Sequence, residues 1–232
     1  MIDVTAEQLT PEQHEIQALC REFAEKEIRP ISLEVDEADT AMPWGIWEKA
    51  SDLGLTSFML PEEYGGGGMT DVLTQCIVQE ELCHGCSGIG NLITSNGFFA
   101  DPVLELGTEE QKRRWIEPLC SARPPLTALA TTEPDAGSDA ASMQTTATRR
   151  DGGYVLRGQK TWISNGGIGE EYVVFATVAP GTRSRGHHCV PARAERPGPV
   201  VRRADAQDGP ARDRERRDVP RRRARRGRPQ AG

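Results

Sequence analysis

Two short blocks of the sequence combine hydroxyls, carboxylates and glycines in a way that suits ligand binding. Residues 132–139 read T-E-P-D-A-G-S-D and follow directly on Thr131. Such a turn aims backbone N–H groups and hydroxyls at one point, and Gly137 lets a ligand approach where a Cβ would obstruct it. Asp and Ser also stabilise ordinary turns. The block alone therefore fits an anion-binding loop or a plain loop.

The second block, residues 158–166, reads G-Q-K-T-W-I-S-N-G. It predicts a strand over residues 159–164 that ends in a turn, with Lys160, Trp162 and Ser164 on one face. A tryptophan beside a hydroxyl suits a planar heteroaromatic ligand, although tryptophan is more often a core residue. These residue types permit a cofactor site without requiring one.

The order and spacing of four motifs carry a family resemblance. The blocks at residues 132–139 and 158–166 resemble the two flavin-binding signatures of the acyl-CoA dehydrogenase family. The runs L-P-E-E-Y-G-G-G-G at residues 60–68 and G-T-E-E-Q-K at residues 107–112 are similar to the family's other motifs. The chain is identified as a member of this family over about residues 5–186, and no resemblance is expected beyond Gly186.

The resemblance implies α,β-dehydrogenation of an acyl-CoA thioester with FAD, in fatty-acid or amino-acid catabolism. A carboxylate removes the α-proton, and the β-hydrogen leaves as hydride to the flavin N5. By resemblance, the Thr132 hydroxyl lies near the pyrimidine edge, Trp162 packs on the ring and Ser164 donates towards N5. Ser138 also meets the substrate, and Thr131 replaces the family's usual aliphatic residue. The implied flavin contacts are Leu129, Ala130, Thr131, Thr132, Gly137, Ser138, Trp162, Ile163 and Ser164.

No catalytic residue is assigned. Glu133 lies inside the first signature, but the resemblance implies that this glutamate is structural and that the base comes from a C-terminal helical domain. We expect that domain to be missing from this chain. A missing general base costs about 10²–10⁴ in rate, so we expect an inactive fragment. The resemblance also implies an acyl-CoA substrate, an electron-transfer acceptor and a homo-oligomer, which is doubtful for a fragment. An acyl-CoA oxidase or a flavin monooxygenase on the same scaffold stays open.

The hydrophobic pattern predicts helices first and strands second, which is an α+β chain. We expect an N-terminal all-α helical domain at residues 1–125 and a truncated antiparallel β domain at residues 126–186. Capping residues place helix starts at Thr10, Pro43, Thr70 and Thr108. Three of the expected helices end near residues 29, 54 and 118, the helix from Thr70 includes Leu82, and another covers residues 88–100. The expected strands cover residues 126–131, 143–149, 154–157, 159–164 and 172–178.

Two further patterns receive structural interpretations. The glycine run at residues 65–68 lacks the Gly-Lys-Ser/Thr that a phosphate-binding loop needs, so we interpret it as a connection. Cys83 and Cys86 have C-x-x-C spacing without a second pair, which favours thiols at a helix end over a metal site. The six cysteines suggest no disulfide framework.

The charge is divided unevenly along the chain. Residues 1–180 carry 12 Lys+Arg and 29 Asp+Glu, a net −17, whereas residues 181–232 carry 16 and 6, a net +10. From residue 187 the sequence is rich in Arg and Pro, and it has too few apolar residues to build a core. We therefore predict a disordered basic tail over residues 187–232. A non-enzymatic fragment with a nucleic-acid-binding tail is the third alternative, disfavoured because the tail offers no aromatic residue for base stacking.

The tail also suggests an out-of-frame translation. Codons can be chosen for residues 186–191 such that a shift of one nucleotide reads Gly-Ile-Thr-Ala-Phe, a strand of the family's type. A shift at residues 207–212 gives Arg-Met-Gly-Gln-Arg, which resembles a later family segment. No secretory signal and no run of about 18 apolar residues is present, so we expect no membrane span and a soluble, cytoplasmic protein.

Overall fold

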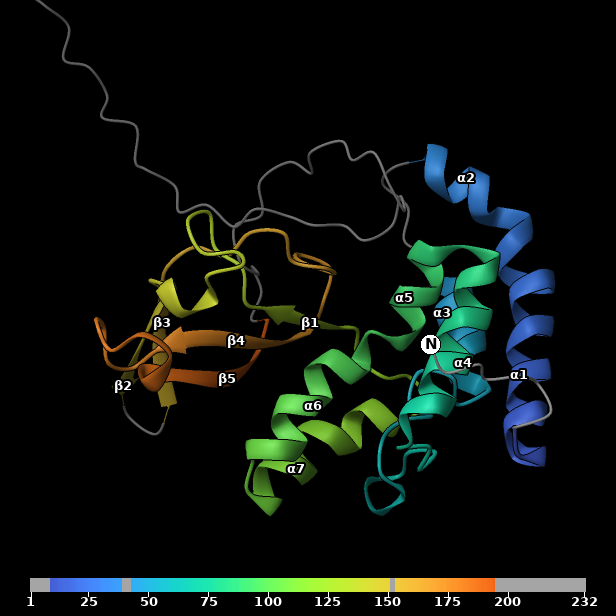
Figure 1. Cartoon of the computed structure of the whole chain (residues 1–232), viewed down its shortest axis with the longest axis horizontal. Coiled ribbons are helices and arrows are strands. Elements are labelled where there is room, and N and C mark those ends of the chain that lie inside the picture. The colour runs from blue at the N-terminus through green and yellow to red at the C-terminus, as the bar shows by residue number, and fades with distance from the viewer. Residues whose placement is uncertain (1–8, 39–42, 151–152, 195–232) are drawn as a thin grey trace, which may run out of the picture.

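The computed structural model describes residues 9–38, 43–150 and 153–194 of the 232-residue chain. Figure 1 shows a group of helices at one end of the molecule and a β-sheet at the other, with helices α6 and α7 between them. Within the described residues, no helix is both long and apolar enough to cross a membrane.

Helix α1 (Pro11–Phe23) begins as the sequence predicts. The Thr10 hydroxyl accepts a hydrogen bond from the Gln13 N–H, and the Gln13 side-chain oxygen accepts one from the Thr10 N–H, which completes a capping box. The predicted end at residue 29 is wrong. The chain continues through a π turn (Ala24–Ile28) and a 3₁₀ turn (Arg29–Ile31) into α2 (Ser32–Glu37). Pro30 falls in the first turn of this 3₁₀ segment, where its missing N–H costs nothing.

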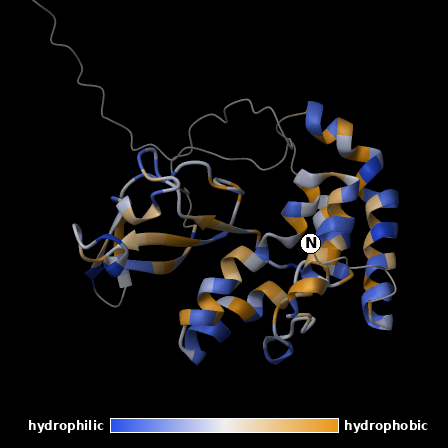
Figure 2. Ribbon diagram, viewed as in Figure 1, coloured by the Kyte–Doolittle hydropathy of each residue, from blue (hydrophilic) through white to orange (hydrophobic). Residues whose placement is uncertain are grey.

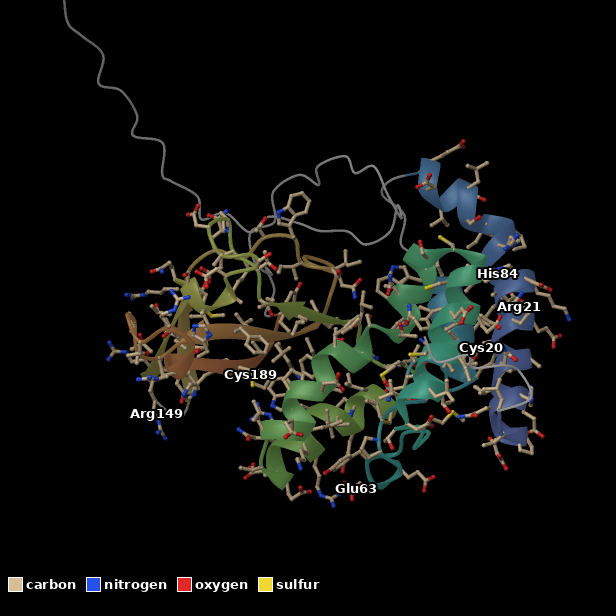
Figure 3. The ribbon with its side chains drawn as sticks, viewed as in Figure 1. Cys20, Arg21, Glu63, His84, Arg149 and Cys189 are labelled. Atoms are coloured by element: carbon tan, nitrogen blue, oxygen red, sulfur yellow. The ribbon has the colours of Figure 1, made fainter. Side chains whose placement is uncertain are left out.

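Helices α3 (Trp44–Asp52), α4 (Val72–Gly85) and α5 (Ser87–Thr94) pack beside α1 around a shared apolar core. Asp71, not Thr70, caps α4, because its carboxylate accepts from the Thr74 N–H at 2.8 Å. Arg21 of α1, labelled in Figure 3, forms an ion pair with the buried Glu81 of α4. Figure 2 shows α1 as mostly hydrophilic, as expected for a helix at the outside of the molecule.

The single helix predicted over residues 88–100 is two helices. Helix α5 ends at Thr94, and α6 (Asn96–Leu106) starts two residues later. Helix α7 (Glu109–Ile116) follows, with the predicted capping box between Thr108 and Gln111. Phe99 of α6 and Trp115 of α7 belong to a second apolar core that also includes Val173 of the sheet. The helical and β parts are therefore joined by packed side chains.

The glycine run at residues 65–68 is a tight connection, as predicted. Its four N–H groups donate to carbonyl oxygens of neighbouring residues, so none of them is free to hold a phosphate. Gly65 and Gly68 have φ angles of 93° and 70°, which favour glycine. A Cβ on Gly66 would lie 2.2 Å from the Leu60 carbonyl oxygen. Close backbone packing thus explains these glycines.

The sheet is mixed, so the prediction of an antiparallel domain is wrong in part. Strand β4 (Glu171–Thr177) lies between β1 (Thr127–Ala130), which is parallel to it, and β5 (His187–Arg193), which is antiparallel. Strand β2 (Thr146–Arg150) joins β4 only at the Thr146–Thr177 pair and forms an antiparallel hairpin with β3 (Gly153–Arg157). Burial does not alternate strictly along these strands: β4 is buried at both ends, and β3 is exposed at most positions. A single sequence also does not specify which strands become neighbours.

Strand β5 corrects the predicted start of the tail. Residues 187–193 pair with the whole of β4, and Cys189, labelled in Figure 3, packs against the second core. The predicted disorder is therefore wrong for residues 187–194, and residues 195–232 lie outside the described part of the chain. Backbone pairing overrides poor strand composition here, because a neighbouring strand satisfies the N–H and C=O groups.

Arg193, in β5, links the sheet to helix α7. Its Nε donates to the Glu171 Oε1 at 2.9 Å, and its guanidinium lies 5.3 Å from the centre of the Trp115 ring. The Glu171 carboxylate is buried, and its Oε2 has no hydrogen-bond partner among the described residues. Burial raises the pKa of Glu171, with Arg193 opposing the shift.

Candidate functional site

The first signature block leaves β1 as a tight turn. After Thr131 and Thr132, residues Glu133 and Ala136 exchange backbone hydrogen bonds of 3.1 and 3.2 Å. This local hairpin brings the two threonines to the end of the strand. Gly137 follows with no neighbouring atom within 4 Å of a Cβ built on it. The chain therefore leaves open space above this glycine.

A buried ion pair anchors the turn. The Glu133 carboxylate accepts from the Gln144 N–H at 2.6 Å, from the Thr145 N–H at 2.9 Å and from Lys160 Nζ at 2.9 Å. Lys160 Nζ also donates to the Thr131 carbonyl oxygen at 2.8 Å. Both charged side chains are about 6% exposed. The second block thus holds the first through a lysine that reaches beneath the turn.

The same contacts keep Glu133 ionised. Burial alone would raise the pKa of Glu133, but the hydrogen bonds from Gln144, Thr145 and Lys160 outweigh it and hold that pKa below its usual value. Burial lowers the pKa of Lys160, and the Glu133 charge opposes the shift. A carboxylate stabilised in this way is a weak proton acceptor. Its geometry makes Glu133 an anchor rather than a base.

The second signature block is not a strand, which corrects the predicted strand at residues 159–164. Trp162 and Asn165 have φ angles of 56° and 61°, in the left-handed region, and break the extended alternation. Lys160 is buried, whereas Trp162 is 47% exposed, so the expected common face does not exist. The Thr161 N–H donates to the Thr132 carbonyl oxygen at 3.0 Å, which ties the two blocks together.

Both blocks and the helices line one cavity of about 290 Å³. The end of β1 and the following turn supply one wall, the irregular turn after Thr161 supplies another, and helices α5 and α6 close the third side. The lining residues are Gly88, Asn91, Leu92, Ser95, Phe98, Thr127, Leu129, Thr131, Thr132, Trp162, Ser164 and Asn165.

The structure brings together five of the nine residues predicted to contact a flavin: Leu129, Thr131, Thr132, Trp162 and Ser164 line the cavity. Ala130 and Ile163 are buried in a small core beneath it, as expected for alternate residues of a strand and a turn. Gly137 and Ser138 are exposed and do not line the cavity. The last two therefore lie outside the space that the other predicted residues enclose.

The cavity is polar without being ionisable. Its lining offers hydroxyls of serine and threonine, two asparagine amides and one indole, but no Asp, Glu, His, Lys, Cys or Tyr side chain. Such a lining can hydrogen-bond and stack on a planar polar ligand. It cannot supply a general base from the described residues. No group of three or more potential metal ligands occurs among those residues either.

Sequence reasoning missed the helical wall and Asn165. Gly88, Asn91, Ser95 and Phe98 recur three or four residues apart, a spacing that marks one face of a helix. The available signal in the sequence was a helix face with small and polar residues at Gly88, Asn91 and Ser95, where a face packed in the core would be apolar. Asn165 served only as a turn indicator in the sequence, and nothing local reveals its contacts with residues about 40 and 70 positions earlier.

Comparisons with known proteins agree with this architecture. The family model described as "Acyl-CoA dehydrogenase, N-terminal domain" matches residues 10–123, and "Acyl-CoA dehydrogenase, middle domain" matches residues 128–214. The middle-domain match passes Gly186, so the expectation that the resemblance stops there is wrong. Short-chain specific acyl-CoA dehydrogenase of Bos taurus is 36% identical over 178 residues, which are 76% of this chain and 42% of that protein.

Two further relatives give the same result. An acyl-CoA dehydrogenase of Bacillus subtilis is 37% identical over 187 residues, covering 79% of this chain and 47% of that protein. The structure of butyryl-CoA dehydrogenase from Megasphaera elsdenii matches with a TM-score of 0.82 and 30% identity, covering 94% of this chain and 58% of that chain. The chain thus spans less than half the length of the two sequence relatives. With both domain models matched in order and the two signature blocks meeting at one cavity, the chain belongs to the acyl-CoA dehydrogenase family.

Proposed function

We propose that this chain supplies the helical and middle domains of an FAD-dependent acyl-CoA dehydrogenase, an oxidoreductase that removes hydrogen from Cα and Cβ of an acyl-CoA thioester. The observation that carries the proposal is the meeting of Thr131, Thr132, Trp162 and Ser164 at one cavity. These four residues come from two blocks separated by about 30 positions in the sequence. A cavity built from both blocks is what a cofactor held by both would require.

The lining fits a flavin. Trp162 is 47% exposed, whereas Trp47 and Trp115 are 4% and 7% exposed, so the Trp162 indole is not a core side chain. An exposed indole beside hydroxyl groups can cover an apolar ring face while hydroxyls meet its polar edge. When bound, the flavin supplies the acceptor for the hydride. Trp162 would cover its ring system, and Thr132 and Ser164 would hydrogen-bond to its edge.

Ser138 and Gly137 receive a separate role. Both are exposed at the turn after β1, next to the space that is open above Gly137. We assign them to the outer part of the cofactor and to the substrate, as the resemblance implies. This assignment is compatible with the cavity, because neither Gly137 nor Ser138 is among its lining residues.

We do not expect the 232-residue chain to turn over acyl-CoA by itself. Proton removal from Cα needs a base, and the described lining of the cavity contains none. We therefore propose that the base comes from outside the described lining of this cavity. We propose that the substrate is an acyl-CoA and that the acceptor is an electron-transfer protein.

An FAD titration tests the proposal. We expect weak, saturable binding by the 232-residue chain, measured by the quenching of flavin fluorescence. Trp162→Ala should weaken it about tenfold, because it removes the stacking surface. Trp44→Ala is the matched control, since Trp44 is 45% exposed on α3 and does not line the cavity. Equal affinities of the Trp162→Ala variant and the wild type would overturn the proposal.

The out-of-frame tail stays a separate prediction. The pairing of β5 with β4 and the middle-domain match to residue 214 count against a shift over residues 187–214. Sequencing the codons for residues 183–190 on independent template tests it. One extra base there would support the shifted frame, and an uninterrupted frame would remove the hypothesis.

A further inference from the structure

Asn165 occupies an unusual position at the edge of the cavity. It is 3% exposed, lines the cavity, and has a φ angle of 61°. Asparagine tolerates the left-handed region better than most residues. Three residues earlier Trp162 adopts the same region at 56°, where a bulky side chain is a clear outlier. The turn from Trp162 to Asn165 therefore has a left-handed residue at each end, and the strain is greater at Trp162.

Such strain persists only where the surroundings fix the conformation. The Asn165 side chain provides two fixed points through one amide group. Its Nδ2 donates to the Thr127 carbonyl oxygen at 2.8 Å and to Ser95 Oγ at 3.2 Å. Thr127 is the first residue of β1, and Ser95 lies between helices α5 and α6. One side chain thus connects the turn to the sheet and to the helical part.

The acceptors are themselves held in place. Ser95 Oγ donates to the Leu92 carbonyl oxygen at 2.8 Å, and Thr127 Oγ1 donates to Asn96 Oδ1 at 3.0 Å. The Asn165 carbonyl oxygen accepts from the Ile168 and Gly169 N–H groups at 3.1 and 2.8 Å. Apart from the half-buried Ile168, these residues are buried or line the cavity, and hydrogen bonds there exclude alternative arrangements.

We infer that Asn165 is a positioning residue: its amide holds Trp162 and Ser164 in the orientation that lets them face the cavity, by fastening their turn to Thr127 and Ser95. The inference rests on the proposed function, because Trp162 and Ser164 are taken to hold the flavin. The inference predicts that the orientation of Trp162 and Ser164 depends on the hydrogen bonds of the Asn165 amide more than on the left-handed backbone of Asn165. Glycine at this position would relieve the backbone strain and remove the amide.

The Asn165→Gly variant therefore separates the effect of the amide hydrogen bonds from the effect of the strained backbone. Hydrogen exchange of the whole chain, followed residue by residue by NMR, reports the turn through the amides of Gly166, Ile168 and Gly169, which all donate within it. We expect about tenfold faster exchange in the glycine variant, because two buried hydrogen bonds are lost. If backbone strain alone mattered, exchange would stay equal or become slower.

Two other variants complete the design. Ser95→Ala removes one acceptor and keeps Asn165, so it should accelerate the same amides by a smaller factor even if Asn165→Gly fails to fold. Asn91→Ala is the control: Asn91 lines the same cavity, but its Oδ1 accepts from Gln79 at 3.0 Å. Exchange of the turn should be unchanged in the control. Unchanged exchange in both Asn165→Gly and Ser95→Ala would overturn the inference.

FAD titration gives the second measurement. We expect the Asn165→Gly variant to bind FAD about tenfold more weakly than the wild type, measured where urea denaturation shows that both proteins are fully folded. A purely structural role would lower the urea midpoint without lowering the affinity of the folded protein. If wild-type chain binds no FAD but the exchange result holds, the proposed function fails and the fastening of the turn stands. If wild type binds FAD and the variant matches it in exchange and affinity, the inference fails and the proposed function stands.

Discussion

Two buried glutamates respond to pH in opposite ways. Hydrogen bonds from two backbone N–H groups and Lys160 overcome burial and hold the pKa of Glu133 low. Burial raises the pKa of Glu171, which has one partner, Arg193, and an unpaired Oε2. The stability that Glu133 contributes is present above its unfolded pKa and is lost as pH falls through its folded pKa. The pKa of Glu171 is raised on folding, so the stability that its protonated form contributes is present at low pH and is lost as pH rises through the folded pKa. Its ionised form therefore lowers stability at neutral pH.

Glu171→Gln should consequently stabilise the protein at neutral pH. Without a buried charge, the free energy of unfolding should rise by about 1 kcal/mol at pH 7.5. The gain should disappear below about pH 4.3, where wild-type Glu171 is protonated in both the folded and the unfolded state. Urea denaturation at both pH values measures the difference in free energy of unfolding between the variant and the wild type. The contribution of Glu133 is the same in both proteins and drops out of this difference.

Glu170→Gln is the control for this measurement, because Glu170 is the exposed neighbour of the same residue type. Its substitution should change stability by less than about 0.5 kcal/mol. A Glu171→Gln variant that is less stable than wild type at pH 7.5, or equally shifted at both pH values, would contradict this account of the buried carboxylate.

At the scale of elements, the glycine run offers a sharp test. A Cβ on Gly66 would lie 2.2 Å from the Leu60 carbonyl oxygen, an atom that cannot move without its backbone. Gly66→Ala should lower the free energy of unfolding by about 1–3 kcal/mol. Gly45→Ala in α3, where nothing lies within 4 Å, should instead raise it by about 0.5 kcal/mol. Equal urea midpoints of the two variants would refute this packing argument.

The elements that the sequence predicted well are those with local causes. The capping boxes at Thr10 and Thr108 depend on residues three positions apart, and both helices begin where expected. The strands near residues 127, 146, 153 and 171 were also located, because short runs of β-branched residues lie between turn residues. The two signature blocks pointed to the wall of the cavity that contains Trp162.

The features that sequence reasoning missed depend on distant partners. Strand β5 has two histidines, a cysteine and a proline, and forms because β4 offers an unpaired edge. The turn after Thr161 read as a strand because nothing in the local sequence reveals the positive φ angles of Trp162 and Asn165, and the partners of Asn165 lie far away in the chain. Predicting the helical wall of the cavity likewise requires information on which helix faces the sheet, and the sequence does not contain it locally.

At the scale of the whole molecule, β5 should determine whether the sheet stays docked to the helices. We expect a chain ending at Gly186 to be less stable than one ending at Ala194, because β4 loses its pairing with β5 and the buried Glu171 loses the half-exposed Arg193. The shorter chain would also leave one edge of β4 unpaired, which favours aggregation. Urea denaturation and light scattering measure both effects. Equal stability and solubility of the two chains would show that β5 contributes nothing.

The cavity has a thermodynamic consequence because its walls come from both parts of the molecule. Helices α5 and α6 form one side, and β1 with the turn after Thr161 forms the others. A ligand that fills the cavity contacts two units at once, so it binds only when they are docked. Ligand at 100 times its dissociation constant then adds about 2.7 kcal/mol to the docked state. Bound cofactor would thus act as a reversible cross-link between the two parts, and above its dissociation constant the stabilisation would grow with the logarithm of the free cofactor concentration.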